Sequence, residues 1–398
     1  MKQYLQRTWA EINLDALRHN FSAICSAIKP TCQAMPVIKA DAYGHGAVVC
    51  AKELIEAGAS CFAVSNLEEA LQLRQNGIEQ PLLILAYTPP SEAVRLAQYH
   101  ITQTVVSYEY AKALSDAAKQ ENVTVTIHVK LDTGMSRVGF FYHDENRDSS
   151  VLQDIATACS LPGLYAEGIF THFSSADEEQ GNNHTKKQYM LFTHAIEQLH
   201  HQGVTFSLHH CCNSAAIMMY QDYQYEMVRP GIILYGLLPD HSWMKNNLDL
   251  QPVMQLKSVI SLCKTVPANT TVNYGRTYVT ERQTILATVP IGYADGYPRS
   301  MGNHAYMLVC GKRVPVVGRI CMDQCVIDVT DVPDVKEGMT VTVFGTDGEE
   351  TISVDELAQI HNTINYEMVC MIGTRVPRVF LKSGKTMDIL NYIYSETN

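Results

Sequence analysis

The chain has 398 residues, of which 46% are hydrophobic and 18% are charged, and its formal net charge is −11. This composition is typical of a globular protein with room for one large domain and a second one, and the acidic balance makes nucleic acid and anionic membranes poor partners. The N-terminus lacks a signal-peptide core and no apolar run approaches the ~20 residues of a membrane helix, so we expect a cytoplasmic protein.

Residues 35 to about 240 alternate between apolar, β-branched segments and helical segments. Strands are predicted at 36–39, 61–65, 81–87, 101–107, 123–132, 166–173, 205–214 and 227–236. Helices are predicted at 14–28, 47–58, 66–77, 91–99, 108–120, 151–160, 186–203 and 214–221. This α/β alternation predicts a TIM-type (β/α)8 barrel, which we place at residues 10–243. A doubly wound open sheet is the alternative, but no G-x-G-x-x-G follows the first strand, which disfavours a dinucleotide-binding version.

After about residue 245 the pattern changes to strand-like segments separated by Gly, Asn, Asp and Pro. These segments lie at 253–266, 283–293, 305–331 and 339–345, with one helix at 353–362. The pattern predicts a mostly β C-terminal domain, formed by residues 1–9 and 244–398. Residues 8–14 are strand-like, and we expect them to pair with that domain.

Polar side chains stand at the C-terminal ends of the predicted barrel strands, where barrel enzymes carry their chemistry. They are Lys39, Ser65, Asn66, Tyr87, Ser107, Lys130, Asp132, His172, Asn213, Ser214 and Arg229. Strands end in loops, so chance alone places some polar residues there. Two lysines, an arginine and a histidine on one rim exceed that expectation, and we therefore predict an active site at this end of the barrel.

Lys39 directly follows the apolar, β-branched segment that ends in Val37 and Ile38. A buried ammonium group is costly without a partner, so the side chain either reaches the rim or works as a desolvated amine. An amine of that kind forms Schiff bases with carbonyl substrates or with pyridoxal phosphate. Tyr43 and the glycines around it would add a hydroxyl group and open backbone beside the amine.

A phosphate cradle is predicted at the ends of the seventh and eighth strands. Asn213 and Ser214 open a helix, where backbone N–H groups bind anions, and Gly231 and Ile232 add N–H groups on the next strand. Arg229 either pairs with an acid or faces the pyridine nitrogen of pyridoxal phosphate. Because arginine keeps its proton, the second arrangement would leave that nitrogen unprotonated and make the ring a weaker electron sink.

Twelve cysteines in a chain of this length do not form a disulfide scaffold. The run HHCCNS at 209–214 invites a zinc interpretation, but neighbouring strand residues point to opposite faces and no second ligand pair lies at a suitable spacing. We predict no metal site.

Nine segments, in order along nearly the whole chain, resemble those of the alanine racemase family. They are PVIKADAYGHGAV (36–48), HVKLDTGMSRVGF (128–140), GIFTHFSSAD (168–177), NSAA (213–216), VRPGIILYG (228–236), NYG (273–275), PIGYADGY (290–297), GRICMDQ (318–324) and INYE with RVPR (364–378). The resemblance implies an N-terminal barrel, a C-terminal β domain and a head-to-tail homodimer with shared active sites. It also implies a pyridoxal-phosphate-dependent isomerase that interconverts L- and D-alanine and supplies D-alanine for peptidoglycan in the cell wall.

The resemblance assigns roles residue by residue. Lys39 would carry the cofactor; its phosphate would be held by Tyr43, Asn213, Ser214, Gly231 and Ile232, its ring would stack near His172, and Arg229 would bond the pyridine nitrogen. Arg137 would reach the phenolic oxygen and the substrate carboxylate, positioned by a carbamylated Lys130. The second subunit would supply Tyr274 as the opposing base, the Met322 backbone with Asp323 near the carboxylate, and Tyr293 at the entrance.

Racemisation needs a base on each face of a planar carbanion, and Lys39 and Tyr274 would be those bases. An unperturbed tyrosine titrates near ~10, too high for a good base at neutral pH. We therefore expect neighbouring cations, with His172 and Arg229 as the candidates, to lower the pKa of Tyr274.

One residue departs from the family pattern. Thr374 stands before RVPR, where the family often carries a tyrosine that contacts the phosphate and crowds the substrate side. The pocket is expected to be roomier, which makes serine the natural second substrate. A change of this kind shifts preference by only ~1–3 kcal/mol, so alanine stays the favoured substrate.

Three other functions were weighed against the racemase. A pyridoxal-phosphate-dependent decarboxylase should carry a nucleophilic cysteine motif and a different phosphate loop. A non-enzymatic cofactor-binding protein with the same barrel should lack residues 245–398 and so Tyr274. A cofactor-free Schiff-base aldolase would need neither Arg229 nor the cradle at Ser214 and Gly231.

Overall fold

The structure, a computed structural model, describes residues 4–394 and divides into two compact units. The barrel unit comprises residues 17–42 and 47–251. The β unit comprises the residues up to Ala16, the short segment Tyr43–Gly46 and the residues from Pro252 on. The domain limits given above, 10–243 and 1–9 with 244–398, stay a prediction.

Parallel strands form the centre of the barrel unit. They are β2 (Gln33–Ala34), β3 (Phe62–Val64), β4 (Leu82–Ile84), β5 (Ile101–Val105), β6 (Val125–Asp132), β8 (Leu164–Phe170), β9 (Leu208–His210) and β10 (Met227–Val228), in the sheet order β2-β10-β9-β8-β6-β5-β4-β3. The short β7 (Phe140–Phe141) pairs with β6. Val37, just after β2, pairs in parallel with Ala63 of β3, and this bridge joins the two ends of the sheet. The predicted (β/α)8 barrel is confirmed.

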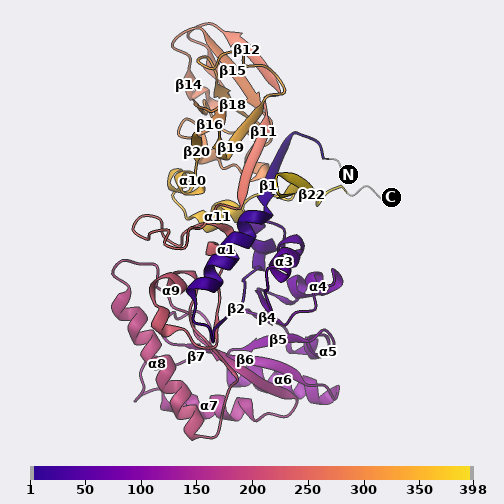
Figure 1. The fold of residues 1–398 in the computed structure, drawn as a ribbon, viewed down its shortest axis with the longest axis vertical. Helices are drawn as coiled ribbons and strands as arrows, with labels where there is room; N and C mark the ends of the chain where they lie inside the picture. The colour runs from indigo at the N-terminus through magenta and orange to yellow at the C-terminus, as the bar shows by residue number, and fades with distance from the viewer. Residues whose placement is uncertain (1–3, 395–398) are drawn as a thin grey trace. The chain divides into compact units, whose positions relative to one another are not determined.

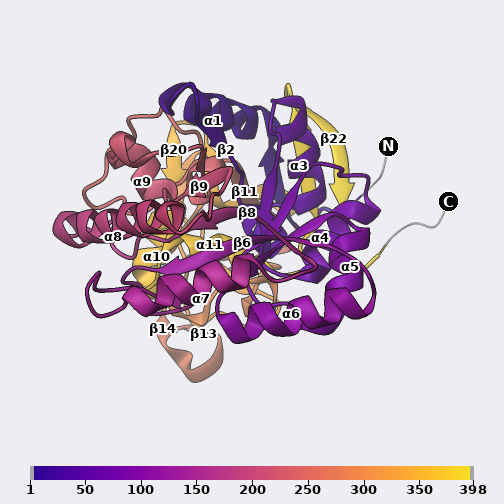
Figure 2. The ribbon, with the colours of Figure 1, turned by 90° about the horizontal axis from the view of Figure 1, so that it is seen from below.

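Helices surround these strands, as the view from below shows (Figure 2). They are α1 (Leu14–Ala27), α3 (Ala47–Glu56), α4 (Leu67–Gln75), α5 (Ala93–Gln98), α6 (Tyr108–Gln120), α7 (Ser149–Cys159), α8 (Asn182–His201) and α9 (Ser214–Met219). Side-chain caps start several of them: Asn66 accepts the Glu69 N–H at α4, and Ser107 accepts the Tyr110 N–H at α6. Within residues 4–394, no helix is both long and apolar enough to cross a bilayer.

The predicted strand 227–236 is wrong beyond Val228. There the chain leaves the sheet and forms the 3-10 helix η3 (Ile232–Tyr235). Pro230 cannot donate to a strand ladder, and the Leu234 N–H instead bonds back to the Gly231 carbonyl at 2.9 Å. The turn keeps Gly231 and Ile232 at the strand end.

Of the predicted first strand, 36–39, only Val37 makes a bridge to the sheet, and Lys39 begins a short helix, α2 (Lys39–Gly44). The φ angles of Ala40, Asp41, Ala42 and Tyr43 lie between 51° and 54°, so this helix is left-handed. Left-handed helical geometry costs L-residues ~1–2 kcal/mol each, and a run of four requires compensation from the surroundings.

Hydrogen bonds hold this left-handed turn at both ends. In the barrel unit, the Ala42 N–H donates to the Ile38 carbonyl at 2.9 Å, and the Asp41 carboxylate accepts the Ala47 N–H at 2.7 Å. In the β unit, the Gly44 carbonyl accepts from Nε of Arg378 at 2.8 Å. Gly44 has φ +81°, and a Cβ there would lie 2.5 Å from the Val369 carbonyl oxygen, so only glycine fits.

The β unit is built on an eight-stranded sheet (Figure 1). Its strands are β1 (Thr8–Asn13), β11 (Met254–Val259), β16 (Tyr306–Val309), β17 (Lys312–Pro315), β19 (Thr340–Asp347), β20 (Glu350–Ile352), β21 (Arg378–Lys382) and β22 (Lys385–Leu390). Smaller sheets are formed by β12 (Leu262–Val266), β15 (Thr284–Val289) and β18 (Cys325–Asp328), and by β13 (Thr271–Val272) and β14 (Tyr278–Val279). The mostly β C-terminal domain is confirmed.

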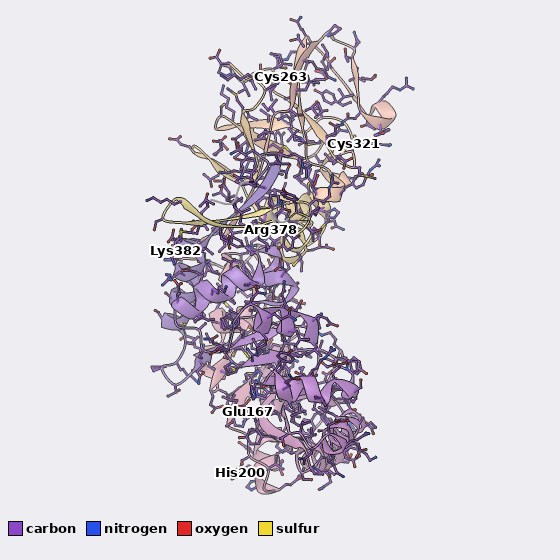
Figure 3. The ribbon with its side chains drawn as sticks, turned by 90° about the vertical axis from the view of Figure 1, so that its right-hand side faces the viewer. Glu167, His200, Cys263, Cys321, Arg378 and Lys382 are labelled. Carbon is purple, nitrogen blue, oxygen red and sulfur yellow. The ribbon has the colours of Figure 1, made fainter. Side chains whose placement is uncertain are left out.

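The N-terminal strand belongs to this sheet as expected. β1 pairs antiparallel with β11 and parallel with β21, so Ala10 lies between Leu256 and Arg378. Figure 3 labels Arg378 at the start of β21. The predicted helix at 353–362 is α10 (Val354–His361), whereas α11 (Asn365–Cys370) was not predicted.

Candidate active site

His172 is the point where the predicted strand-end residues of the barrel unit meet. It is partly buried, and its pKa lies well below the usual value because of burial first and then because of four basic side chains. In decreasing order of effect, these are Arg229, Lys130, Arg137 and Lys39. His172 is therefore neutral near pH 7. The expectation that His172 and Arg229 act on Tyr274 stays a prediction.

Lys130 lies inside the barrel with 4% of its surface exposed. Its Nζ donates to the Leu131 carbonyl at 3.2 Å and stands 5.2 Å from the ring centroid of Phe170. Burial, and then the charge of Arg229, lower its pKa to about 7. A substantial fraction of this amine is therefore neutral and nucleophilic near pH 7.

The carboxylate of Asp132 organises the loop that carries Arg137. Its Oδ1 accepts the N–H groups of Gly134, Met135 and Ser136, each at 3.0 Å, and its Oδ2 accepts the Arg137 N–H at 3.1 Å. Burial alone would raise the pKa of Asp132, but the backbone bonds, led by that of Ser136, lower it below its ordinary value. The backbone of Arg137 is thus held in place by one ionised side chain.

Arg229 follows β10 and is 3% exposed. Its Nη2 donates to the carbonyls of Thr171 at 2.8 Å and Cys211 at 3.2 Å and contacts Nδ1 of His172 at 3.3 Å. Burial lowers its pKa to about 10, so it is still protonated near pH 7. Its Nε–H makes no hydrogen bond within residues 4–394 and is available to a ligand.

A line of hydrogen bonds runs from Arg229 into the barrel. Nη1 of Arg229 lies 2.8 Å from Nδ1 of His210, whose Nε2 lies 2.9 Å from Nδ1 of His128; Nε2 of His128 lies 3.2 Å from Oε2 of Glu167. Since a guanidinium group can only donate, Nδ1 of His210 must accept, and each imidazole then carries its proton on Nε2. The pKa of Glu167 is lowered, chiefly by the bond from His128. These residues were not predicted as a group.

The two halves of the predicted phosphate cradle touch each other. Asn213 caps α9 by accepting the Ala216 N–H at 3.0 Å, and Oγ of the buried Ser214 accepts the Gly231 N–H at 2.9 Å. Ile232 is fully buried at the start of η3.

The donor set of the barrel unit suits pyridoxal phosphate. Four basic side chains lower the pKa of His172, and among the side chains that shift the pKa of Lys130 only Asp132 is an anion. Such an excess of positive charge favours a ligand that carries a phosphate dianion and further anionic oxygens. The Nε–H of Arg229 could donate a hydrogen bond to a pyridine nitrogen, and the amine of Lys39 could form a Schiff base with an aldehyde.

In the β unit, three segments bring together further predicted residues. The Tyr293 N–H donates to the Cys321 carbonyl at 3.1 Å, and the Ala294 N–H donates to the Met322 carbonyl at 3.0 Å. A Cβ at Gly292 would lie 2.3 Å from that Met322 oxygen, which explains the glycine before Tyr293.

The third segment carries Thr374. Asp323 forms an ion pair with Nη1 of Arg375 at 2.8 Å, which places Asp323 beside the residue that follows Thr374. The Gly373 N–H donates to the backbone carbonyl of the fully buried Asp295 at 3.0 Å, and Asp295 also pairs with Arg7. Met322, Asp323, Tyr293 and Thr374 therefore belong to one cluster.

Tyr274 stands in η4 (Tyr274–Arg276) with 71% of its surface exposed. The turn around it is braced, because the Asn273 amide donates to the Arg319 carbonyl at 3.0 Å, and a Cβ at Gly275 would lie 2.8 Å from Nη1 of Arg319. The β unit thus presents this hydroxyl group outward from a fixed turn.

Tyr43, by contrast, is buried, with its ring centroid 6.1 Å from that of Tyr366. Burial raises its pKa, so its hydroxyl group stays neutral.

Comparisons with known proteins cover both units. Residues 12–239 match the family model described as "Alanine racemase, N-terminal domain", and residues 253–380 match "Alanine racemase, C-terminal domain". "Alanine racemase 1" of Clostridium acetobutylicum is 42% identical over 393 residues, which cover 99% of this chain and 100% of that protein.

Solved structures agree with these matches. An alanine racemase of Clostridium difficile 630 has a TM-score of 0.93 at 40% identity, covering 98% of this chain and 100% of that one. An alanine racemase of Bartonella henselae, described with covalently bound pyridoxal phosphate, has a TM-score of 0.83 at 28% identity, covering 94% and 99%.

Proposed function

The chain belongs to the alanine racemase family, whose members interconvert L- and D-alanine with pyridoxal phosphate, and we propose which of its residues carry that reaction. The observation that carries the proposal is the group of four basic side chains, Lys39, Lys130, Arg137 and Arg229, that lower the pKa of His172, with Arg229 in contact with its ring at 3.3 Å. Lys39 begins α2, Lys130 lies in β6, Arg137 lies on the loop after β6 and Arg229 follows β10, and their charge fits the cofactor and an amino-acid carboxylate together.

The cofactor is held by side chains and backbone of the barrel rim. Lys39 would bind it covalently and Arg229 would donate to the pyridine nitrogen, while His172 would lie against the ring. Tyr43, Asn213, Ser214, Gly231, Ile232 and Thr374 would hold the phosphate. When bound, pyridoxal phosphate withdraws electrons from Cα of the amino acid and so acidifies its C–H bond. Because Arg229 keeps its own proton, this withdrawal is moderate.

Two bases exchange the Cα proton. The amine of Lys39 serves one face and the phenolate of Tyr274, from a second copy of the chain, serves the other. In one turnover, one base removes the proton from Cα and the conjugate acid of the other returns a proton to the opposite face. The protonation states of the two groups are thereby swapped, which prepares the enzyme for the reverse reaction.

The substrate carboxylate is bound by Arg137, with the Met322 backbone and Asp323 contributed by the second copy and Tyr293 at the entrance. A carbamate on Lys130 would turn this cation into an anion that pairs with Arg137. The pKa of about 7 supports this modification, since a neutral amine is the form that attacks CO2.

A homodimer follows from these assignments, because Lys39 and Tyr274 act on one substrate from two copies. The exposure of Tyr274 on its braced turn supports this. The twelve cysteines suit a reducing compartment, so the proposal includes a cytoplasmic enzyme that supplies D-alanine for the cell wall. Alanine is the main substrate, and serine is the second candidate because Thr374 replaces the larger tyrosine.

Reduction of the purified protein with borohydride tests the cofactor assignment. The protein should be yellow and racemise L-alanine, and reduction should fix one pyridoxyl group on the peptide that contains Lys39. Lys39→Ala should lose racemisation by at least about a thousandfold, because one base and the covalent link disappear together. Lys29→Ala is the matched surface control. Label on another lysine, or an active Lys39→Ala variant without added amine, would refute the assignment.

A further inference from the structure

The left-handed turn that begins at Lys39 is held by a carboxylate from α4, the helix that follows the second strand of the barrel. We propose that Glu69 is a positioning residue for Lys39, and that its carboxylate fixes the turn by bonding the backbone of Ala40. This inference rests on the proposed role of Lys39 as the covalent cofactor site and as one of the two bases.

Both carboxylate oxygens of Glu69 are used. Oε1 accepts the Ala40 N–H at 2.8 Å, and Oε2 accepts the Ser65 N–H at 2.7 Å. Ala40 follows Lys39 at the end of the first barrel strand, and Ser65 ends the second. The side chain therefore ties the ends of two neighbouring strands to each other at the residue beside the reactive lysine.

The position of Glu69 is itself fixed by its helix. The Glu69 N–H donates to Oδ1 of Asn66, the N-cap of α4, at 2.9 Å. A glutamate three residues after an N-cap ordinarily bonds the N–H of the cap residue. Here the carboxylate reaches one residue further back, to Ser65, and crosses to the neighbouring strand.

The turn depends on such a contact for two reasons. The first N–H groups of a helix have no partner within it, and the Ala40 N–H is one of them. None of Ala40, Asp41 or Ala42 is a glycine, so the backbone has no intrinsic preference for the left-handed region that all three occupy. Asp41 fastens the turn to α3, whereas Glu69 fastens its start, next to the Cα from which the Lys39 side chain extends.

The competing explanation is that Glu69 is an ordinary acidic residue in the first turn of α4, where it would favour the helix dipole. Glu68 shares that turn but is exposed, and among residues 4–394 it makes no hydrogen bond or ion pair with α2. The dipole explanation predicts equal effects for the two residues, whereas positioning predicts an effect for Glu69 alone.

Glu69→Gln and the matched control Glu68→Gln separate these explanations. A glutamine keeps one acceptor, but its NH2 group would face the second backbone N–H. In the full-length protein loaded with pyridoxal phosphate, amide hydrogen exchange at Ala40 and Ser65 should be at least about tenfold faster in Glu69→Gln. The kcat for alanine should fall about ten- to a hundredfold with KM changed less than about twofold. Glu68→Gln should match the wild type in both.

A rescue variant keeps the test independent of general damage. Ala40 is exposed and left-handed, so Ala40→Gly relieves strain without opening a cavity. Glu69→Gln combined with Ala40→Gly should regain part of the lost kcat. The proposal is overturned if Glu69→Gln equals Glu68→Gln, if exchange rises without a fall in kcat, or if the glycine rescues nothing. Wild-type protein without borohydride-trapped cofactor at Lys39 would instead refute the proposed function, while exchange at Ala40 would still decide the contact.

Discussion

At the residue scale, the buried amine of Lys130 is the side chain whose chemistry depends most on its surroundings. Its pKa of about 7 follows from burial and from the charge of Arg229. At a fixed CO2 concentration, carbamate formation should rise steeply between pH 6 and pH 8, because the neutral fraction of the amine grows and because each carbamate that forms releases a proton. Carbon-13 NMR with labelled bicarbonate measures this adduct. A signal of equal size in Lys130→Ala would show that it arises elsewhere.

Thr374 sets the second residue-scale prediction. Thr374→Tyr should lower kcat/KM for serine relative to alanine by about tenfold or more. The larger side chain leaves less room for the extra hydroxyl group of serine, and a change of this kind shifts substrate preference by ~1–3 kcal/mol. Steady-state kinetics with both amino acids give the ratio, and Thr374→Ser is the control for loss of the methyl group alone. An unchanged ratio would remove Thr374 from the account of substrate choice.

At the scale of elements, the loop that carries Arg137 depends on one carboxylate. Asp132→Asn keeps Oδ1 as an acceptor but places an NH2 group against the Arg137 N–H, and should cost about 1–3 kcal/mol in the free energy of unfolding at pH 7. The folded pKa of Asp132 lies below its ordinary 3.8, so its stabilisation is present above that pH and is lost as the pH falls through the folded pKa.

Urea unfolding at pH 7 and at pH 3 measures this difference. The gap between wild type and Asp132→Asn should narrow at the lower pH, and Asp116→Asn on the exposed face of α6 should show little effect at either. A gap that widens on acidification would contradict the proposed charge state.

The elements also show what the sequence can and cannot predict. Alternating strands and helices predicted the barrel because each segment carries its own periodicity, and the cap at Asn66 is a local signal. The left-handed turn after Lys39 carries no local signal in the sequence. Its alanines favour a right-handed helix, and its partners at Glu69 and Arg378 are distant in sequence. Glu69 was not predicted as a site residue, since nothing local shows that its carboxylate reaches a neighbouring strand.

At the scale of the whole molecule, the chain distributes the reaction over two units. The barrel unit holds Lys39, Arg137, His172 and Arg229, whereas the β unit holds Tyr274 and the cluster around Asp323. Resemblance to a family located Tyr274, because neither composition nor spacing distinguishes it among 21 tyrosines. In the proposed function, Tyr274 acts with Lys39 of a second copy of the chain, so that two copies complete each other's sites.

Mixing two inactive variants tests that requirement most directly. Lys39→Ala and Tyr274→Phe each lack one base in every site, and both should be nearly inactive alone. After co-refolding, a mixed dimer contains one site with both bases, so random pairing should restore about a quarter of the wild-type racemase activity. If the mixture stays as inactive as its parents while mixed dimers are present, the two bases do not come from different chains, and the shared site is refuted.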